Sequence, residues 1–212
     1  MCRDLSCAGH FGKWGTGMKC DILIAGVGGQ GTVLASRLIA AASMEQGWFV
    51  RTAETIGMAQ RGGCVVSHVR IDSEQKSSMI PFGKADLLIG FEPAEALRHL
   101  LRVAPGGNCV VNTKAIIPAV VPLSGKTYDW QAILDVLGQR ENTILIDATA
   151  LALQAGSVKT VNIVLLGIAS GYGFFPFSHA ALEAAVAEHI PRKFRELNLT
   201  ALSLGYQASR SR

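Results

Sequence analysis

The 212-residue sequence has few charged and few aromatic residues, which make up 17% and 7% of the chain. Apolar residues make up 49%, and a chain of that composition is too hydrophobic to remain disordered. There are 7 prolines and no glycine period, so a collagen-like structure is excluded. The 23 glycines and the shortage of aromatics favour closely packed helices on a sheet over an all-β sandwich. At about 150 residues per domain, the length predicts one large domain.

Cysteine motifs are also missing. The number of cysteines is odd and no C-x-x-C occurs, so neither a structural zinc site nor an iron–sulfur cluster is predicted. No pair of histidines has the spacing of metal ligands. His68, inside an expected strand, is interpreted as structural, and His99 as solvated. Scattered thiols indicate a reducing compartment, and hence a cytoplasmic protein. The five cysteines are Cys2, Cys7, Cys20, Cys64 and Cys109.

No segment has the pattern of a signal peptide or a membrane span. Residues 1–17 are glycine-rich and lack an apolar stretch, so we expect a loose N-terminal extension, with Met18 as a candidate start and 18–212 as a single domain. The apolar segment 161–177 contains three glycines and a proline, which favours a buried helix. The net charge of +4 is concentrated from Arg192 onward. We interpret this as a solvated terminal helix and expect no nucleic-acid partner.

Hydrophobic patterns alternate between strands and helices along the chain. This order predicts a three-layer α/β/α sandwich of Rossmann-like type with a mostly parallel sheet. The strand at 64–71 follows a short connection, so it could run antiparallel and give a mixed sheet. The predicted strands are 20–27, 48–53, 64–71, 86–91, 108–112 and 143–147. The predicted helices are 30–46, 93–103, 129–137, 148–155, 161–169, 180–190 and a last one from 192 to about 206.

A glycine-rich motif follows the first predicted strand. Gly26, Gly28, Gly29, Gln30 and Gly31 fit G-x-G-x-x-G between a strand and a helix. Glycines let the backbone approach a phosphate, and the N–H groups at the start of a helix favour an anion. The turn is therefore predicted to bind a phosphate group. The alternative is a tight turn that needs glycine only for packing.

A second glycine-containing segment follows at 54–63. Glu54 lies 23 residues after Gly31, close to where a nicotinamide enzyme places its ribose-binding acid. Gln60, Arg61 and Gly62 follow within GMAQRGG, which is unusual for such a site. Arg61 could clamp a phosphate, bind a carboxylate of a partner or lie on the surface.

Three segments together resemble one family. They are GVGGQGTVLASRLIAAA at 26–42, TAETIGMAQRGGCVVSHVRI at 52–71 and ADLLIGFEPAEALR at 85–98. They resemble the gamma-type domain of 2-oxoacid:ferredoxin oxidoreductases, most of all the beta subunit of the indolepyruvate enzymes. The segment PRKFRELNLTALSLGY at 191–206 is similar to the last helix of that subunit. Ile56 departs from the pattern, because many members carry a histidine there.

The resemblance implies an accessory subunit. Its complex would oxidatively decarboxylate an arylpyruvate such as indolepyruvate, form an acyl-CoA and reduce ferredoxin. Thiamine diphosphate, Mg²⁺ and 4Fe–4S clusters would lie on a larger alpha subunit. Gly26, Gly28, Gly29, Gln30 and Gly31 would form the phosphate-binding turn. Glu54, Gln60, Arg61 and Gly62 would lie nearest coenzyme A or the partner's active site.

The resemblance also implies that no residue of this chain is catalytic. Alone, the chain would be inactive and could form a homodimer. Two other functions stay open on the residues themselves. One is an autonomous NAD-dependent dehydrogenase. The argument against it is that the sequence shows no catalytic acid–base set. The other is a non-catalytic nucleotide-binding or assembly module.

Overall fold

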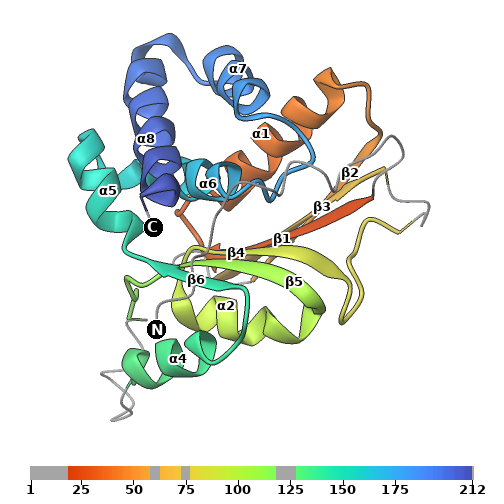
Figure 1. The fold of residues 1–212 in the computed structure, drawn as a ribbon, viewed down its shortest axis with the longest axis vertical. Helices are drawn as coiled ribbons and strands as arrows, with labels where there is room; N and C mark the ends of the chain where they lie inside the picture. The colour runs from red at the N-terminus through yellow and green to blue at the C-terminus, as the bar shows by residue number, and fades with distance from the viewer. Residues whose placement is uncertain (1–18, 58–62, 73–76, 118–127, 212) are drawn as a thin grey trace, which may run out of the picture.

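The computed structural model describes residues 19–57, 63–72, 77–117 and 128–211. They form one α/β unit (Figure 1). The predicted extension 1–17 lies outside the described residues. The strands are β1 (Cys20–Val27), β2 (Val50–Ile56), β3 (Cys64–Ile71), β4 (Ala85–Gly90), β5 (Val103–Asn112) and β6 (Thr143–Ile146). The helices are α1 (Thr32–Glu45), α2 (Pro93–His99), α4 (Trp130–Gly138), α5 (Ala148–Ala155), α6 (Val161–Gly171), α7 (His179–His189) and α8 (Arg192–Arg210), with 3-10 turns at Leu100–Arg102 and Val158–Thr160.

The strands form one mixed sheet in the order β2-β3-β1-β4-β5-β6. β1, β4, β5 and β6 run parallel, whereas β3 is antiparallel to both of its neighbours, β1 and β2. From β1 the chain crosses to one edge of the sheet, and from β4 it moves towards the other edge. The point between β1 and β4 is therefore a topological switch point, where α/β proteins place ligands beyond the carboxyl ends of the strands.

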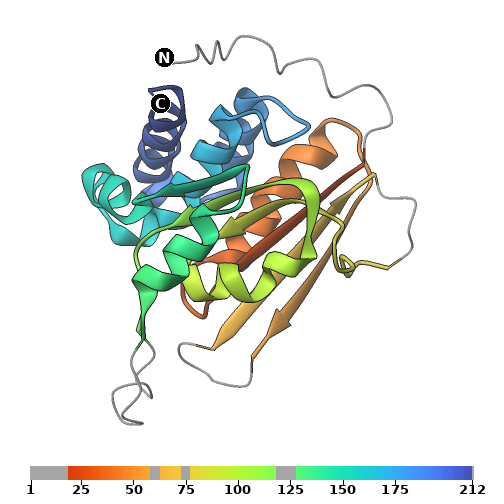
Figure 2. The same cartoon turned by 60° about the horizontal axis from the view of Figure 1, so that its bottom comes forward.

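Helices cover both faces of the sheet, which gives the predicted sandwich. α1 and α6 lie directly on one face, and α7 and α8 cover them from outside, while α2 and α4 lie on the opposite face (Figures 1 and 2). The core under α1 and α6 is larger than the core under α2 and α4. α6 and α8 cross closely because Gly167 has no side chain. A Cβ atom at this position would lie 2.2 Å from the Leu202 carbonyl oxygen. The predicted mostly parallel, mixed α/β sandwich is confirmed.

Most element boundaries agree with the sequence patterns, and the differences have local causes. β2 extends through Glu54 to Ile56, where a glycine-containing loop or a short helix was predicted, because these residues pair with β3. The predicted helix 93–103 ends as α2 at His99. β5 begins at Val103 rather than at 108, since Val103 already pairs with Ala85 on β4. The last helix continues to Arg210.

The amino end of β1 holds a buried ion pair. Asp21 and Arg70 are both fully buried, and the Arg70 guanidinium donates to both carboxylate oxygens at 2.8 and 2.9 Å. Arg70 also donates to the backbone oxygens of Ser77 and Met79. The Asp86 carboxylate accepts from the Asp21 backbone N–H at 2.7 Å. Buried charges in proteins need such partners, and this end of the sheet provides them within the chain.

Candidate functional site

The glycine-rich motif forms the connection between β1 and α1. Gly29 and Gly31 have φ angles of 95° and 80°, in the left-handed region that favours glycine. The side chain of Gln30 folds back into the turn. Its Oε1 accepts from the Val27 N–H at 2.7 Å, and its Nε2 donates to the Phe91 carbonyl at 3.1 Å. The Gln30 amide thus joins the ends of β1 and β4 across the switch point.

Gly26 is required by this folded-back amide. A Cβ atom at Gly26 would lie 2.7 Å from Gln30 Oε1. Part of the motif is therefore explained by packing, which was the alternative interpretation. The φ angles of Gly29 and Gly31 are explained by the sharp entry into α1. The packing explanation and the binding prediction are compatible, because Gly29 and Gln30 also line a cavity.

The turn is joined to the β2–β3 hairpin through the backbone. The Gly28 N–H donates to the Gly63 carbonyl at 2.8 Å, so this N–H is already used within the chain. The Gly57 N–H donates to the Cys64 carbonyl at the loop end of the same hairpin. Among the described residues no side chain caps the start of α1, whose N-cap is Gly31. The N–H groups at the start of a helix carry a partial positive charge.

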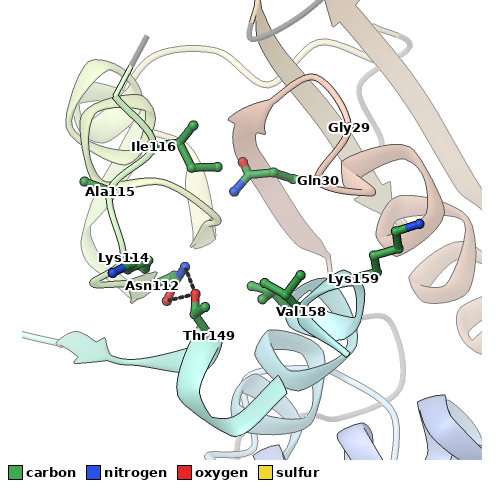
Figure 3. Close-up of a pocket in the computed structure, with 10 residues that line it drawn as sticks. Gly29, Gln30, Asn112, Lys114, Ala115, Ile116, Thr149, Val158 and Lys159 are labelled. Carbon is green, nitrogen blue, oxygen red and sulfur yellow. Dashed lines mark hydrogen bonds between the residues drawn. The ribbon is translucent and has the colours of Figure 1, made fainter. Parts of the chain in front are cut away.

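A cavity of about 350 Å³ opens beside the turn, at the carboxyl ends of β1, β5 and β6. Pockets that bind small molecules are typically about 300–1,000 Å³. Gln30 points into the cavity from one side and Ile116 from the other (Figure 3). Asn112 at the end of β5 and Thr149 in α5 form its floor, and the Asn112 amide donates to the Thr149 hydroxyl at 3.1 Å. The remaining lining residues are Gly29, Lys114, Ala115, Val158, Lys159 and Val161.

Two lysines make the rim of the cavity electropositive. Lys114 follows β5, and Lys159 lies in the 3-10 turn before α6. Both are exposed, and they lie on opposite sides of the opening with their amino groups directed outward (Figure 3). Asp147 at the end of β6 is occupied as the N-cap of α5, where it accepts from the Ala150 N–H at 2.8 Å. The rim is therefore suited to an anionic group of a ligand.

Glu54 does not reach the position that a nicotinamide site requires. β3 lies between β1 and β2, so the strand that carries Glu54 is two positions from the glycine turn. Neighbouring strands are about 4.8 Å apart, which displaces Glu54 by roughly 10 Å from β1. Its carboxylate is exposed and accepts from the Ser36 hydroxyl at 3.4 Å. Gln60, Arg61 and Gly62 lie outside the described residues. Of the two glycines that flank this segment, Gly57 and Gly63, the second accepts a hydrogen bond from Gly28 of the glycine turn.

Several residues of the site were not predicted from the sequence. Lys114 and Lys159 lie in short connections, and Thr149 lies in the first turn of α5. None of the three belongs to a sequence motif, and only their positions just after a strand or before a helix could have indicated them. The prediction for His99 was wrong. Its ring is partly buried, Nε2 lies 3.8 Å from the Cys64 sulfur, and burial lowers its pKa. Burial, and next the Glu95 carboxylate, raise the pKa of Cys64 to about 12.

The structural interpretation of His68 agrees with its surroundings. It is 1% exposed, and its Nδ1 accepts from the Ile80 N–H at 3.1 Å. Burial lowers its pKa to about 4, with the nearby Arg102 acting in the same direction. His68 is therefore a neutral acceptor inside the sheet and lies away from the cavity.

A three-layer α/β domain with a mixed sheet and a glycine turn at its switch point is a Rossmann-like, doubly wound α/β protein. Comparison with known proteins makes this assignment specific. The chain belongs to the pyruvate ferredoxin/flavodoxin oxidoreductase family, whose model matches residues 21–208. The resemblance that the sequence motifs indicated is thereby confirmed.

Relatives within this family share most of their length with the chain. It is 40% identical over 193 residues to indolepyruvate oxidoreductase subunit IorB of Archaeoglobus fulgidus, a match covering 89% of this chain and 94% of the relative. The same subunit of Thermococcus kodakarensis is 34% identical, with 90% and 96% covered. The fold matches the keto/oxoacid ferredoxin oxidoreductase gamma subunit of Geobacter sulfurreducens with a TM-score of 0.66 at 24% identity, covering 91% of this chain and 99% of that one.

Proposed function

We propose that this chain is the accessory beta subunit of an indolepyruvate, or closely related arylpyruvate, ferredoxin oxidoreductase. The complex oxidatively decarboxylates a 2-oxoacid to an acyl-CoA and passes the electrons to ferredoxin. The observation that carries the proposal is the 34–40% identity to IorB subunits over nearly the full length of both chains. Pyruvate-type relatives are more distant, at 22–27% identity, which favours an aryl substrate.

The chemistry of decarboxylation is assigned to a larger alpha subunit. Thiamine diphosphate, Mg²⁺ and 4Fe–4S clusters supply carbanion stabilisation and electron transfer there. The described cysteines support this division, because Cys20, Cys64 and Cys109 lie on three different strands and two of them are fully buried. They do not form a cluster ligand set, so no step is assigned to this chain's thiols. Alone, the chain would be inactive and could form a homodimer.

Coenzyme A is assigned to the crevice as a co-substrate. Lys114 and Lys159 would contact its phosphate groups, with Gly28, Gly29, Gln30 and Gly31 beside them. Glu54, Gln60, Arg61 and Gly62 would lie along the hairpin that faces coenzyme A or the partner's active site. The electropositive rim and the uncapped start of α1 support this assignment. A larger protein with a domain of this fold, the 2-oxoglutarate:ferredoxin oxidoreductase of Magnetococcus marinus, was solved with coenzyme A bound.

The cytoplasm is the proposed location of the complex. Across the parts of the chain that the structure describes, every helix is too short or too polar to cross a bilayer. Cys20, Cys64 and Cys109 are free thiols, as is usual in a reducing compartment.

The test is anoxic purification of the tagged full chain from its native cells. The proposal predicts a brown complex that contains a larger subunit, thiamine diphosphate, iron and acid-labile sulfide. Indolepyruvate, coenzyme A and ferredoxin should together support turnover. Arg61→Ala should lower the affinity of the complex for coenzyme A. A colourless chain that purifies alone would contradict the proposal. Tight NADH binding by that chain would favour a dehydrogenase, and binding of another nucleotide without turnover would favour an assembly module.

A further inference from the structure

A cluster of three metal-binding side chains lies on the face of the sheet that α2 covers. Cys64 is the first residue of β3, and Glu95 and His99 come from α2. Residues four apart on a helix lie on the same face, so Glu95 and His99 point in the same direction. The Cys64 sulfur lies 3.8 Å from His99 Nε2. One donor atom from each of the three residues lies within 4.8 Å of the other two.

The carboxylate of this cluster is buried and incompletely satisfied. Glu95 is 7% exposed, and its Oε2 has no hydrogen-bond partner among the described residues. Its charged neighbour is the Arg98 guanidinium, with Nε at 3.5 Å on a side chain that is 63% exposed. An ion pair at that distance with a solvent-exposed partner compensates little of the cost of burying a carboxylate. One buried oxygen of the Glu95 carboxylate, Oε2, therefore has no hydrogen-bond donor among the described residues, while the Cys64 thiol acts on the same carboxylate as a hydrogen-bond donor.

The arrangement fits a small divalent cation. Ligands at about 2.0–2.3 Å from a tetrahedral zinc ion lie roughly 3.5 Å from one another. The sulfur-to-nitrogen distance of 3.8 Å is already close to that separation. Sulfur, imidazole nitrogen and a single carboxylate oxygen are donors that Zn²⁺ and Co²⁺ accept, whereas Mg²⁺ and Ca²⁺ prefer oxygen alone. We propose that Cys64, Glu95 and His99 bind one Zn²⁺, with a water molecule in the fourth position.

The position of the ion gives it a structural role. It would fasten α2 to the first residue of β3, where the Cys64 carbonyl accepts from Gly57. The preceding residue, Gly63, accepts from Gly28 of the glycine turn. The ion would therefore hold the loop end of the β2–β3 hairpin against the glycine turn. It lies on the opposite side of the sheet from the helices α1 and α6.

Cobalt binding tests the site directly. The probe is Co²⁺, added to the untagged full chain without its partner, so that cluster iron does not interfere. Cys2→Ser and Cys7→Ser form the background, because these thiols could bind cobalt independently. We expect one equivalent of Co²⁺ to bind with a sulfur-to-cobalt charge-transfer band and the intense visible bands of a tetrahedral site. One equivalent of Zn²⁺ should displace it and raise the melting temperature.

Variants in that background identify the ligands. Cys64→Ser should abolish the charge-transfer band, and Glu95→Gln and His99→Gln should each weaken Co²⁺ affinity tenfold or more. Cys109→Ser is the matched control, because it removes another cysteine facing the same core and should leave the spectrum unchanged. Circular dichroism verifies that each variant is folded, and His99→Gln provides the test if Cys64→Ser is not. The proposal is overturned if the folded background protein shows no sulfur-to-cobalt band, or if the band persists in Cys64→Ser.

Discussion

The two ends of β1 differ in how their polar groups are satisfied. At the amino end, Asp21, Arg70 and Asp86 form a network that is closed within the chain. At the carboxyl end, the strand opens into the glycine turn, a helix start without a side-chain cap and a cavity with lysines on its rim. At one end of the same strand the charges are paired within the chain. At the other end positive charges remain available to a ligand. Substitutions at the two ends should separate the two properties.

The largest expected effect is on stability, at the amino end. Asp21→Asn removes one charge of the buried pair and with it the carboxylate that accepts two hydrogen bonds from the Arg70 guanidinium. Breaking a buried pair in this way costs about 3–5 kcal/mol, which urea unfolding should detect. The control is Lys19→Ala, because Lys19 is the exposed partner of Asp21 at 3.2 Å. Its loss should cost less than about 1 kcal/mol. Equal costs would mean that the Asp21–Arg70 pair does not anchor this end.

The next prediction concerns the turn at the carboxyl end. Gly31→Ala places a Cβ 2.6 Å from the Asn162 amide nitrogen at a φ of 80°. The matched control is Gly47→Ala, which has a φ of 82° but no atom within 4 Å of the added Cβ. Both should lose about 1–2 kcal/mol from backbone strain, and Gly31→Ala about 1–2 kcal/mol more from crowding. Only Gly31→Ala should also alter coenzyme A binding by the complex. The same loss in both variants would show that Asn162 moves aside freely.

A smaller, pH-dependent effect is expected from His68. Its pKa is lowered to about 4 in the fold, while the unfolded chain keeps a value near 6.5. The unfolded state therefore binds a proton first as the pH falls. Stability should be full above pH 6.5, decrease by up to about 3 kcal/mol between pH 6.5 and 4, and level off below that.

Unfolding measured across this range for the natural chain and for His68→Gln isolates the effect. His99 and His179 also have lowered pKa values, so they add a decrease of the same sign in both proteins. The difference between the two curves belongs to His68. If the stability curves of the two proteins stay parallel between pH 6.5 and 4, the pKa of His68 is not lowered by the fold.

The sequence was most informative where a single local interaction determines the structure. The apolar run at β1 and the glycines before α1 predict their elements because the necessary contacts are near in sequence. The extension of β2 to Ile56 was missed because it depends on pairing with β3. The cavity was missed for the same reason, since Asn112, Thr149 and Lys159 come together only when the sheet forms. Cys64 and His99, 35 residues apart, belong to the same category.

The measurement that tests the account most directly is the KM for coenzyme A in the reconstituted complex. Lys114→Ala combined with Lys159→Ala removes two positive charges from the rim of the crevice. Lys19→Ala combined with Lys84→Ala removes the same charge from the amino end of the sheet. Exposed lysine–phosphate contacts are worth about 0.5–1 kcal/mol each. We therefore expect the rim pair to raise this KM roughly fivefold to thirtyfold, and the control pair to leave it unchanged. An unchanged KM in the rim variant, or equal increases in both, would contradict the assignment of coenzyme A to the carboxyl end.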